Sequence, residues 1–259
     1  MCQLFGASSA TPVRLNFSWK SFALRGSTSD GNPDGWGVAN YIGHDVALFR
    51  EPIPAEDSPL VYFLGNHLPM STLVISHVRN AIGSDVSLAN THPFVRALGP
   101  HSHVFAHNGY ATVESLANAW LTPIGETDSE HLFCRLLNSL EPLWRSGNVP
   151  PLAERLQVVN AFATAIRPHG STNFLYSDGA TLFAHGHRKT LPGRRISSEP
   201  GLHYCESKGA IDDPQGVQFD GPTTDIALVA TTPLDDGEWI AFEPGEVACF
   251  EAGRRVIPD

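Results

Sequence analysis

Hydrophobic and polar residues along the chain follow two different periods, which predict strands toward both ends and helices in the middle. Short apolar runs bounded by turn residues predict early strands over residues 2–8, 35–42, 45–50, 72–79 and 103–109. The last of these closes on Asn108-Gly109, so we expect it to end in a turn. The same pattern predicts late strands over residues 173–178, 180–186, 202–207, 225–231 and 246–252.

Apolar residues spaced three and four apart predict helices between these two groups of strands and one helix within the first group. The predicted helices cover residues 58–68, 112–121, 131–144 and 152–166. We expect Thr127 or Asp128 to cap the third helix and the fourth to close near Arg167-Pro168. Residues 188–200 and 207–224, rich in Gly, Pro and charge, are predicted to be loops. Strands, then helices, then strands again favour a mixed antiparallel α+β fold.

Composition and charge narrow the class of protein. The 259 residues are 42% hydrophobic and 17% charged, which is ordinary for a globular chain, and no repeat or long linker divides them. We therefore expect one domain over residues 1–259. A net charge of −10 disfavours binding to nucleic acid or to an anionic membrane surface. No secretory signal and no apolar stretch of about 18 residues is present, so we expect a cytoplasmic protein.

The first two residues, Met1-Cys2, are the first candidate for chemistry. Met aminopeptidases generally remove Met1 before a small residue, which would give Cys2 both a thiol and a free α-amine. An α-amine has a pKa of about 7.7–8.0 and can take the thiol proton near neutral pH. The alternative is that Cys2 is only a small buried residue at the start of a strand. Cys134, inside an apolar run, is predicted to belong to the core.

Three further motifs carry polar groups, each with an ordinary structural alternative. Arg79 closes a predicted strand and can fork onto a carboxylate, although an arginine there is more often a surface ion-pair partner. Asn108-Gly109 can present an amide and a backbone N–H to an oxyanion, or simply form a hairpin turn. The acids of residues 126–130 open a helix, where they can bind an ammonium group or only cap the helix.

Taken together, these motifs resemble a known family. The order MC, HVRNA at 77–81, AHNG at 106–109 and ETDSE at 126–130 is similar to the class II glutamine amidotransferases, which are N-terminal-nucleophile hydrolases. PDGWG, NTHPF, NFLYSDG and LVATTPLDDGEW also resemble the stand-alone YafJ-like subgroup, so the likeness covers essentially the whole chain. It implies a four-layer αββα sandwich with two facing antiparallel sheets.

The resemblance also implies a role for each matching residue. Cys2 would be the nucleophile and its amine the base, while Asn108 and the Gly109 N–H would form the oxyanion hole. The substrate-binding residues would be Arg79 for the α-carboxylate, Asp128 and the Gly109 carbonyl for the α-ammonium, and Arg25 as part of the pocket wall. The chain departs from the family pattern at Ile82, where many members have threonine, and in a short insert between Arg25-Gly26 and Asp34-Gly35.

The implied reaction is hydrolysis of a γ-glutamyl amide, with glutamine or another γ-glutamyl compound as substrate and no cofactor. An ammonia acceptor, if the reaction has one, would be a separate synthase. Two other hypotheses stay open: a catalytically silent module that binds glutamine or a partner, and a metal-dependent hydrolase. The second would use the histidines, which cluster as His101, His103 and His107 and as His185 and His187. Their spacing gives no ordinary zinc set, so we expect no metal.

Overall fold

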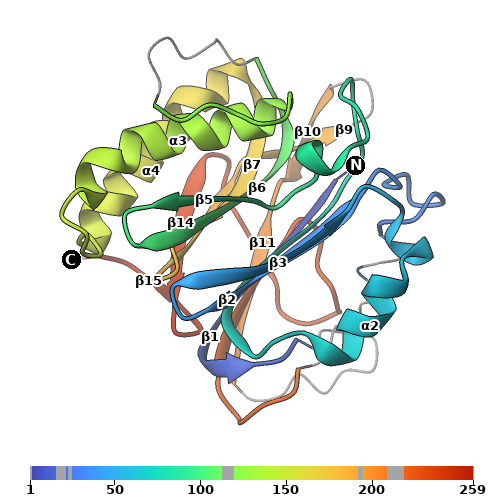
Figure 1. Cartoon of the computed structure of the whole chain (residues 1–259), viewed down its shortest axis with the longest axis horizontal. Coiled ribbons are helices and arrows are strands. Elements are labelled where there is room, and N and C mark those ends of the chain that lie inside the picture. Colours follow the sequence, from blue (N-terminus) through green and yellow to red (C-terminus); the bar gives the residue numbers. More distant parts are fainter. Residues whose placement is uncertain are drawn as a thin grey trace.

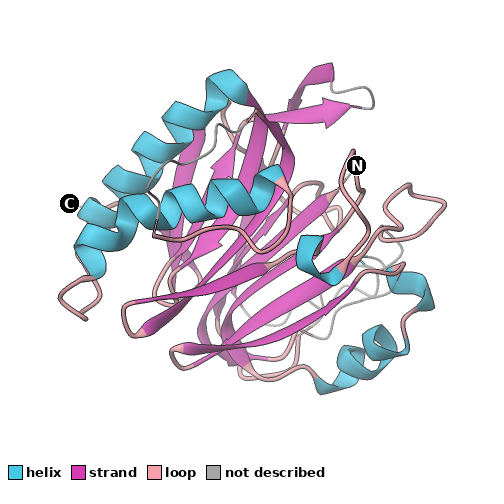
Figure 2. Ribbon diagram, turned by 45° about the horizontal axis from the view of Figure 1, so that its top comes forward, coloured by secondary structure: helices cyan, strands magenta, loops and turns pink. Residues whose placement is uncertain are grey.

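Two antiparallel sheets face each other at the centre of the protein, as the computed structural model shows for residues 2–15, 22, 25–112, 120–191, 195–208 and 219–258 (Figures 1 and 2). The first sheet has the strand order β13-β11-β12-β1-β4-β2-β3. Its strands are β1 (Gln3–Val13), β2 (Trp36–Ile42), β3 (Asp45–Glu51), β4 (Ser71–Val78), β11 (His203–Lys208), β12 (Asp225–Ala230) and β13 (Ile240–Ala241).

The second sheet has the strand order β15-β14-β8-β7-β6-β5. Its strands are β5 (Phe94–Leu98), β6 (His101–Ala111), β7 (Gly170–Ser177), β8 (Leu182–Gly186), β14 (Glu246–Glu251) and β15 (Arg254–Val256). A separate pair is formed by β9 (Arg188–Leu191) and β10 (Arg195–Pro200). The α+β sandwich predicted from the sequence is therefore confirmed.

Helices cover the outer face of each sheet and complete the four layers (Figure 2). The helix α2 (Pro59–His67) packs on the seven-stranded sheet, with Val61 and Leu64 in one core cluster with Phe5 and Val74. On the six-stranded sheet lie α3 (Asp128–Trp144) and α4 (Leu152–Ile166), joined by apolar contacts to the strands beneath. Single 3-10 turns occupy Ala55–Asp57, Leu88–Asn90 and Arg167–His169. No helix of the described residues is long and apolar enough to cross a membrane.

The space between the two sheets is filled by side chains from both, which fixes how the sheets sit against each other. Leu4, Ile75 and Val229 from the first sheet share a buried cluster with Leu175 and Leu182 from the second. Alternate strand residues point to opposite faces, so Phe5, next to Leu4, packs instead in the outer cluster with α2. Alternate residues of β1 therefore pack into two different hydrophobic cores, one between the sheets and one beneath α2.

The strand register brings the predicted site residues to one end of the sandwich. β1 pairs with β4 so that Gln3 lies opposite Val78, which puts Cys2 beside the segment that follows β4. β1 also pairs with β12, with Phe5 opposite Ala230. Because β1 lies in the interior of its sheet, its first residues have a neighbouring strand on each side.

The structure corrects two of the predictions made from the sequence. Asn108-Gly109 is not a turn, because β6 continues to Ala111 in register with β7. Gly109 has a φ of 127°, and a Cβ there would lie 1.8 Å from the carbonyl oxygen of Ser171, so glycine is what lets the two strands run on together. The predicted loop over residues 188–200 contains the paired strands β9 and β10.

The remaining sequence predictions include one missed strand, one confirmed helix cap and one helix that the structure does not describe. The strand β5 was not predicted, because its apolar run is short. Thr127 is the cap of α3, since its side chain accepts a hydrogen bond from the Glu130 N–H at 3.2 Å. The helix predicted over residues 112–121 falls largely on residues 113–119, which lie outside the described part of the chain.

Candidate active site

The thiol of Cys2 lies at the start of β1 and is held by the backbone of one residue. Its Sγ accepts a hydrogen bond from the Asn80 N–H at 3.1 Å and donates to the Asn80 carbonyl oxygen at 3.4 Å. Cys2 is half-buried, whereas Cys134 is buried in the core, as predicted. Cys2 therefore combines an exposed fraction with a backbone donor aimed at its sulfur.

The local environment of Cys2 acts on its acidity in two directions. Burial raises the pKa of the Cys2 thiol, while the Asn80 N–H and the positive charge of Arg79 favour the thiolate. Burial is the larger effect. The thiol therefore needs a base to become the reactive thiolate near neutral pH.

Asn108 reaches the nucleophile from the opposite sheet. Its side-chain Nδ2 donates to the Cys2 carbonyl oxygen at 2.6 Å and to the Thr231 hydroxyl at 3.3 Å. The Thr231 hydroxyl also accepts from the Leu4 N–H at 2.9 Å. All three contacts join residues more than a hundred positions apart in the chain. Thr231 was not singled out from the sequence, although it lies in the LVATTPLDDGEW segment.

Arg79 is buried without a carboxylate partner among the described residues. Its guanidinium donates to the Ser84 hydroxyl at 2.8 Å and to the carbonyl oxygens of Asp85 at 3.1 Å and Asp34 at 3.4 Å. Arg79 is only 3% exposed, and this burial lowers the pKa of its guanidinium. A buried cation whose hydrogen bonds go to neutral oxygens can accept an anion.

The hydroxyl next to Arg79 comes from an unpredicted residue. Ile82, the departure from the family pattern, is 55% exposed, and Ser84 two positions later bonds the guanidinium instead. The insert that follows Arg25-Gly26 folds against the same segment: the Asp34 carboxylate accepts from the Ala81 N–H at 2.7 Å. Both departures therefore lie in loops that contact Arg79 or the residues next to it.

Asp128 opens α3 and ties this helix to β6. Its carboxylate accepts from the N–H of Ala111 at 2.8 Å and from the N–H of Ser129 at 2.8 Å. No cation is paired with it among the described residues. It lies half-buried, two residues from Gly109 along the strand it contacts. A carboxylate in this position can accept an ammonium group beside the Gly109 backbone.

A small hydrogen-bond network connects the loop behind Arg79 to the segment before Asp128. Glu126 accepts from the Asp85 N–H at 2.8 Å and from the Asn90 side chain at 3.2 Å, and its own N–H donates to the Asn90 Oδ1 at 3.0 Å. Arg79 and Asp128 therefore lie next to segments that are hydrogen-bonded to each other.

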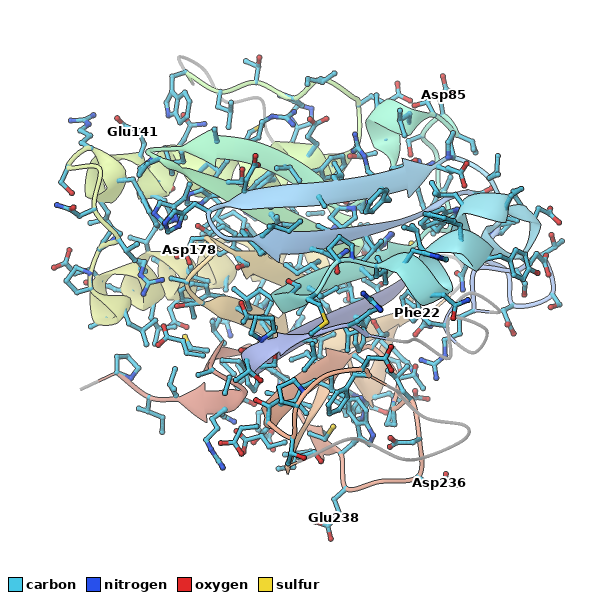
Figure 3. The ribbon with its side chains drawn as sticks, turned by 60° about the horizontal axis from the view of Figure 1, so that its bottom comes forward. Phe22, Asp85, Glu141, Asp178, Asp236 and Glu238 are labelled. Carbon is cyan, nitrogen blue, oxygen red and sulfur yellow. The ribbon has the colours of Figure 1, made fainter. Side chains whose placement is uncertain are left out.

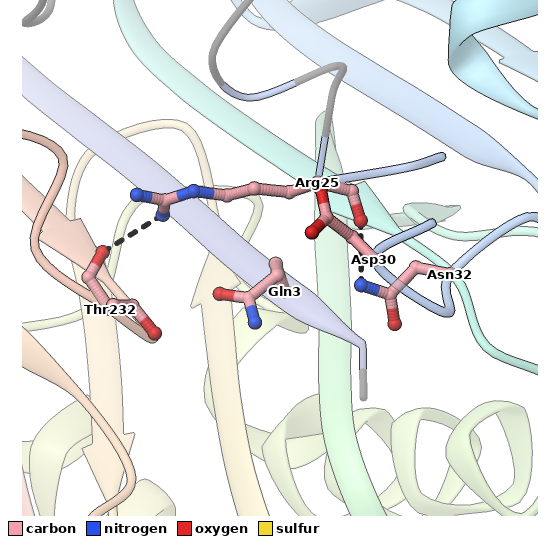
Figure 4. A pocket seen from close by; sticks show the side chains of 5 residues that line it. All are labelled: Gln3, Arg25, Asp30, Asn32 and Thr232. Atoms are coloured by element: carbon pink, nitrogen blue, oxygen red, sulfur yellow. Dashed lines mark hydrogen bonds between the residues drawn. The ribbon is translucent and has the colours of Figure 1, made fainter. Parts of the chain in front are cut away.

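Arg25 lies at the wall of a cavity rather than among these groups. Its guanidinium donates to the carbonyl oxygens of Thr232 at 3.1 Å and Pro233 at 2.8 Å. Burial lowers the pKa of Arg25, and the nearby Asp30 opposes that effect. The cavity has a volume of about 210 Å³ (Figure 4).

Three buried histidines, His77, His92 and His107, lie close to the site and were not grouped from the sequence. The rings of His77 and His92 are 4.3 Å apart, and neither ring nitrogen of His92 has a hydrogen-bond partner among the described residues. His107 contacts the Ser129 hydroxyl at 2.9 Å through Nδ1. Burial lowers the pKa of His77 to about 3, so its ring is neutral near pH 7.

The histidine groups predicted as a metal alternative occupy other positions. His103 contacts Tyr176 and Leu98, and His185 contacts the Glu246 carbonyl oxygen. Within the described ranges, no three His, Cys, Asp or Glu side chains are placed to hold a metal ion. The arrangement therefore offers no support for the metal-dependent alternative.

Comparisons with known proteins point to one family. Residues 1–258 match the model of the class II glutamine amidotransferases. The chain is 32% identical over 270 residues to the Escherichia coli protein YafJ, itself provisionally described as a glutamine amidotransferase, covering 99% of this chain and 100% of YafJ. A Haemophilus influenzae protein with a similar provisional description is 30% identical, over 99% of this chain and 86% of its own length.

Solved structures give the same result for the fold. A predicted glutamine amidotransferase from Pseudomonas aeruginosa superposes with a TM-score of 0.69 at 29% identity, over 99% of this chain and all of the other. The glutamine phosphoribosylpyrophosphate amidotransferase of Bacillus subtilis superposes with a TM-score of 0.60 at 14% identity, over 98% of this chain but 48% of its own. The second likeness concerns the fold alone.

Proposed function

We propose that this chain, which belongs to the class II glutamine amidotransferases, hydrolyses a γ-glutamyl amide through a thioester on Cys2. Glutamine is the simplest such substrate. The proposal requires that Met1 has been removed, because the nitrogen of Cys2 is otherwise a peptide nitrogen and cannot accept a proton.

One observation carries the proposal: the side-chain amide of Asn108 reaches across from the second sheet to within 2.6 Å of the Cys2 carbonyl oxygen. An amide donor held at the residue that carries the thiol can stabilise an oxyanion on the carbon that the thiol attacks. Arg79 and Asp128 add a cation and an anion that form no ion pair among the described residues, and these charges match the α-carboxylate and α-ammonium of a glutamyl group. A γ-glutamyl amide presents both charges and a distal amide.

In the first half of the proposed reaction, the Cys2 amine takes the thiol proton and the sulfur attacks the side-chain carbonyl carbon. A C–S bond forms, and the negative charge on oxygen is stabilised by the Asn108 amide and the Gly109 N–H. One N–H of Asn108 would be shared between the oxyanion and the Thr231 hydroxyl, which lies 3.3 Å from Nδ2 and keeps the amide oriented. The C–N bond then breaks as the protonated Cys2 amine gives its proton to the leaving nitrogen.

In the second half, the Cys2 amine accepts a proton from water, which attacks the thioester. The C–S bond breaks, glutamate leaves and the thiol is restored with the same proton. The raised pKa of the thiol fits this scheme, because a thiol that is not ionised on its own depends on a base for its attack in the first half. Bases and acids therefore return to their starting states after each turnover.

Replacement of Cys2 tests the proposal. Cys2→Ala should lower kcat by at least about a thousandfold while glutamine binding, measured by calorimetry, is retained. Cys205→Ala is the matched control, because Cys205 is also a half-buried thiol on the same sheet but far along the chain, and its rate should equal that of the wild type. An unchanged rate in Cys2→Ala would exclude Cys2 as the nucleophile. Binding without turnover by wild-type protein lacking Met1 would favour a silent glutamine-binding module.

A further inference from the structure

Asn90, the first residue of the NTHPF segment, is a buried polar residue that the reaction described above does not use. It is 2% exposed, and both polar atoms of its side-chain amide are hydrogen-bonded. Its Nδ2 donates to the Asp85 carbonyl oxygen at 3.0 Å and to the Glu126 carboxylate at 3.2 Å, and its Oδ1 accepts from the Glu126 N–H at 3.0 Å. Because a buried amide is costly unless it is bonded, these contacts fix the side chain in place.

The first of these contacts leads to Arg79. The Asp85 carbonyl oxygen that accepts from Asn90 also accepts from the Arg79 guanidinium at 3.1 Å. Ser84, the residue before Asp85, bonds the same guanidinium at 2.8 Å. A displacement of Asn90 would therefore move a segment that holds the cation of the site.

The other contacts lead to Asp128 at the start of α3. Glu126 lies two residues before Asp128, and Thr127 between them caps the helix by accepting from the Glu130 N–H at 3.2 Å. Asn90 bonds both the backbone N–H and the carboxylate of Glu126. The segment that leads into the helix is therefore fixed against Asn90 directly before the anion of the site.

A glycine allows the two segments to approach each other this closely. A Cβ at Gly125 would clash with the Asn90 Oδ1 and would lie 2.9 Å from the Ala89 carbonyl oxygen, so no other residue fits without a shift of the backbone. The Gly125 N–H in turn donates to the buried Glu130 carboxylate at 2.7 Å. The close contact and the bonded amide thus join the same two segments.

The α-carboxylate and the α-ammonium of a glutamyl group are attached to one carbon atom. A site that binds both must hold its cation and its anion at one separation. Arg79 follows β4 in the first sheet, whereas Asp128 opens α3, which packs on the second sheet. The two groups are thus carried by different layers of the sandwich, and Asn90 bonds the segment that contacts one and the segment that precedes the other.

We propose that Asn90 is a positioning residue that fixes the separation of Arg79 and Asp128, and that this separation selects ligands with a carboxylate and an ammonium group on the same carbon. This inference rests on the proposed function. The hydrogen bonds of the Asn90 amide go to Asp85 and Glu126, so its effect is on binding of the glutamyl end and not on bond breaking at the thiol. A fixed separation strengthens binding only where both charges are recognised.

Asn90→Ala tests the inference on protein lacking Met1. We expect KM for L-glutamine to rise at least about tenfold while kcat changes less than about threefold. The Kd of L-glutamate, which carries the same two charges, should rise by a similar factor in calorimetry. An unchanged KM and Kd, or a loss of kcat alone, would overturn the inference.

Ser71→Ala is the matched control for damage to the fold. Ser71 is also buried, and its hydroxyl donates to the carbonyl oxygens of Tyr41 at 2.8 Å and Leu73 at 2.7 Å. It lies at the opposite end of β4 from Arg79, so KM and Kd should equal those of the wild type. A rise in this control equal to that in Asn90→Ala would also overturn the inference.

Glu126 provides a second pair of variants that does not require a buried substitution, because this residue is exposed. Glu126→Ala and Glu126→Gln both remove the negative charge, but only Glu126→Gln keeps an oxygen that can accept from the Asp85 N–H and from the Asn90 amide. KM for Glu126→Ala should therefore exceed that for Glu126→Gln at least about threefold. Equal values would contradict the inference.

A double-mutant cycle separates positioning from general damage. Once Arg79→Gln has removed one of the two charges, their separation no longer matters. Asn90→Ala should then lower kcat/KM by less than about threefold, against at least about tenfold in the wild-type background. A further tenfold loss would show that Asn90 acts independently of Arg79 and would overturn the inference. If the wild type binds glutamate but does not turn over glutamine, the proposed function fails, and the Kd values still decide the role of Asn90.

Discussion

Two buried arginines in separate parts of the molecule, Arg79 and Arg155, have opposite electrostatic environments. They are 3% and 4% exposed. Arg155 on α4 forms an ion pair with the Asp178 carboxylate at 2.7 Å, donates to the Thr181 hydroxyl at 2.9 Å and lies over the ring of Phe183. The hydrogen bonds of Arg79 go to neutral oxygens, one of them from Asp85. The Asp34 and Glu126 carboxylates act on its charge but form no ion pair with it in the described part of the chain. Figure 3 shows Asp178 and Asp85 well apart.

We interpret the ion-paired Arg155 as a residue that stabilises the fold and Arg79 as a residue of the proposed substrate site. A buried charge with a partner holds the helix α4 to the strands beneath it, whereas a buried charge without a partner is retained at an energetic cost. The protein therefore bears that cost at the Cys2 end of the sandwich, where a ligand carboxylate would compensate it. Buried histidines follow the same division: His103 is bonded through both ring nitrogens, and His92, near the site, through neither within the part of the chain that the structure describes.

The largest expected effect is on the compensated arginine. Arg155→Met should lower the free energy of unfolding by about 3–5 kcal/mol, because the Asp178 carboxylate is left buried without its partner. The rate per folded molecule should be unchanged. Urea denaturation followed by circular dichroism measures the loss, with Arg135→Met on the half-buried part of α3 as control, for which the change should be within about 0.5 kcal/mol. A loss as small as that of the control would remove the contrast between the two arginines.

At the uncompensated arginine we expect a loss of catalysis instead. Arg79→Gln should lower kcat/KM by roughly 30-fold to 1,000-fold, equivalent to about 2–4 kcal/mol, mostly through KM. Stability should change little or rise, because a buried cation without a partner has been removed. Arg79→Lys keeps the charge without the fork and should fall between the two. A large loss of stability with unchanged kcat/KM would reverse the interpretation.

The buried histidine His103 predicts a pH dependence of stability. Burial lowers its pKa from the ordinary 6.5 to about 4, so the unfolded chain binds a proton between these pH values that the folded protein does not. Its contribution is complete above pH 6.5 and is lost as the pH falls toward 4. His103→Gln should reduce the slope of unfolding free energy against pH in this window by up to about 1.4 kcal/mol per pH unit. Denaturation curves at several pH values measure the slope, and an unchanged slope would contradict the assignment.

The smallest expected effect concerns the support of Asn108. Thr231→Val removes a buried hydroxyl that accepts hydrogen bonds from Asn108 and from the Leu4 N–H. The loss of a neutral hydrogen bond costs about 1 kcal/mol of stabilisation. We expect kcat to fall roughly fivefold with KM unchanged. Thr231→Ser keeps the hydroxyl and should restore most of the rate. A change in KM alone would place Thr231 outside the support of the oxyanion site.

The spacing of apolar residues was sufficient to predict the helices and strands that bury one face. The helices α3 and α4, and strands such as β4 and β12, follow directly from apolar spacing. The pattern failed at Asn108-Gly109, where the usual turn signal lies inside a strand because Gly109 accommodates the Ser171 carbonyl group. It failed again at β9 and β10, where Gly, Pro and charge in an edge pair look like a loop.

The candidate site shows the same limit more sharply. Cys2, Arg79, Asn108 and Asp128 were found because their order along the chain resembles a family. Thr231, Ser84, His77 and His92 were not assigned roles, because each matters only through contacts set by the packing of the sheets. The bond from Leu4 to Thr231 spans 227 positions, and no local pattern encodes it. Single polar residues inside apolar strands are the signal that could have drawn attention to them.

The central claim is that Cys2, as the first residue of the mature chain, carries the γ-glutamyl group during turnover. Intact-mass and peptide mass spectrometry of protein mixed with glutamine and quenched in acid tests it most directly. The account predicts a terminal peptide that begins at Cys2 and gains the mass of one γ-glutamyl group, with no such gain on the peptides of Cys134, Cys205 or Cys249. A turning-over enzyme whose terminal peptide still begins at Met1, or whose adduct lies on another cysteine, would contradict it.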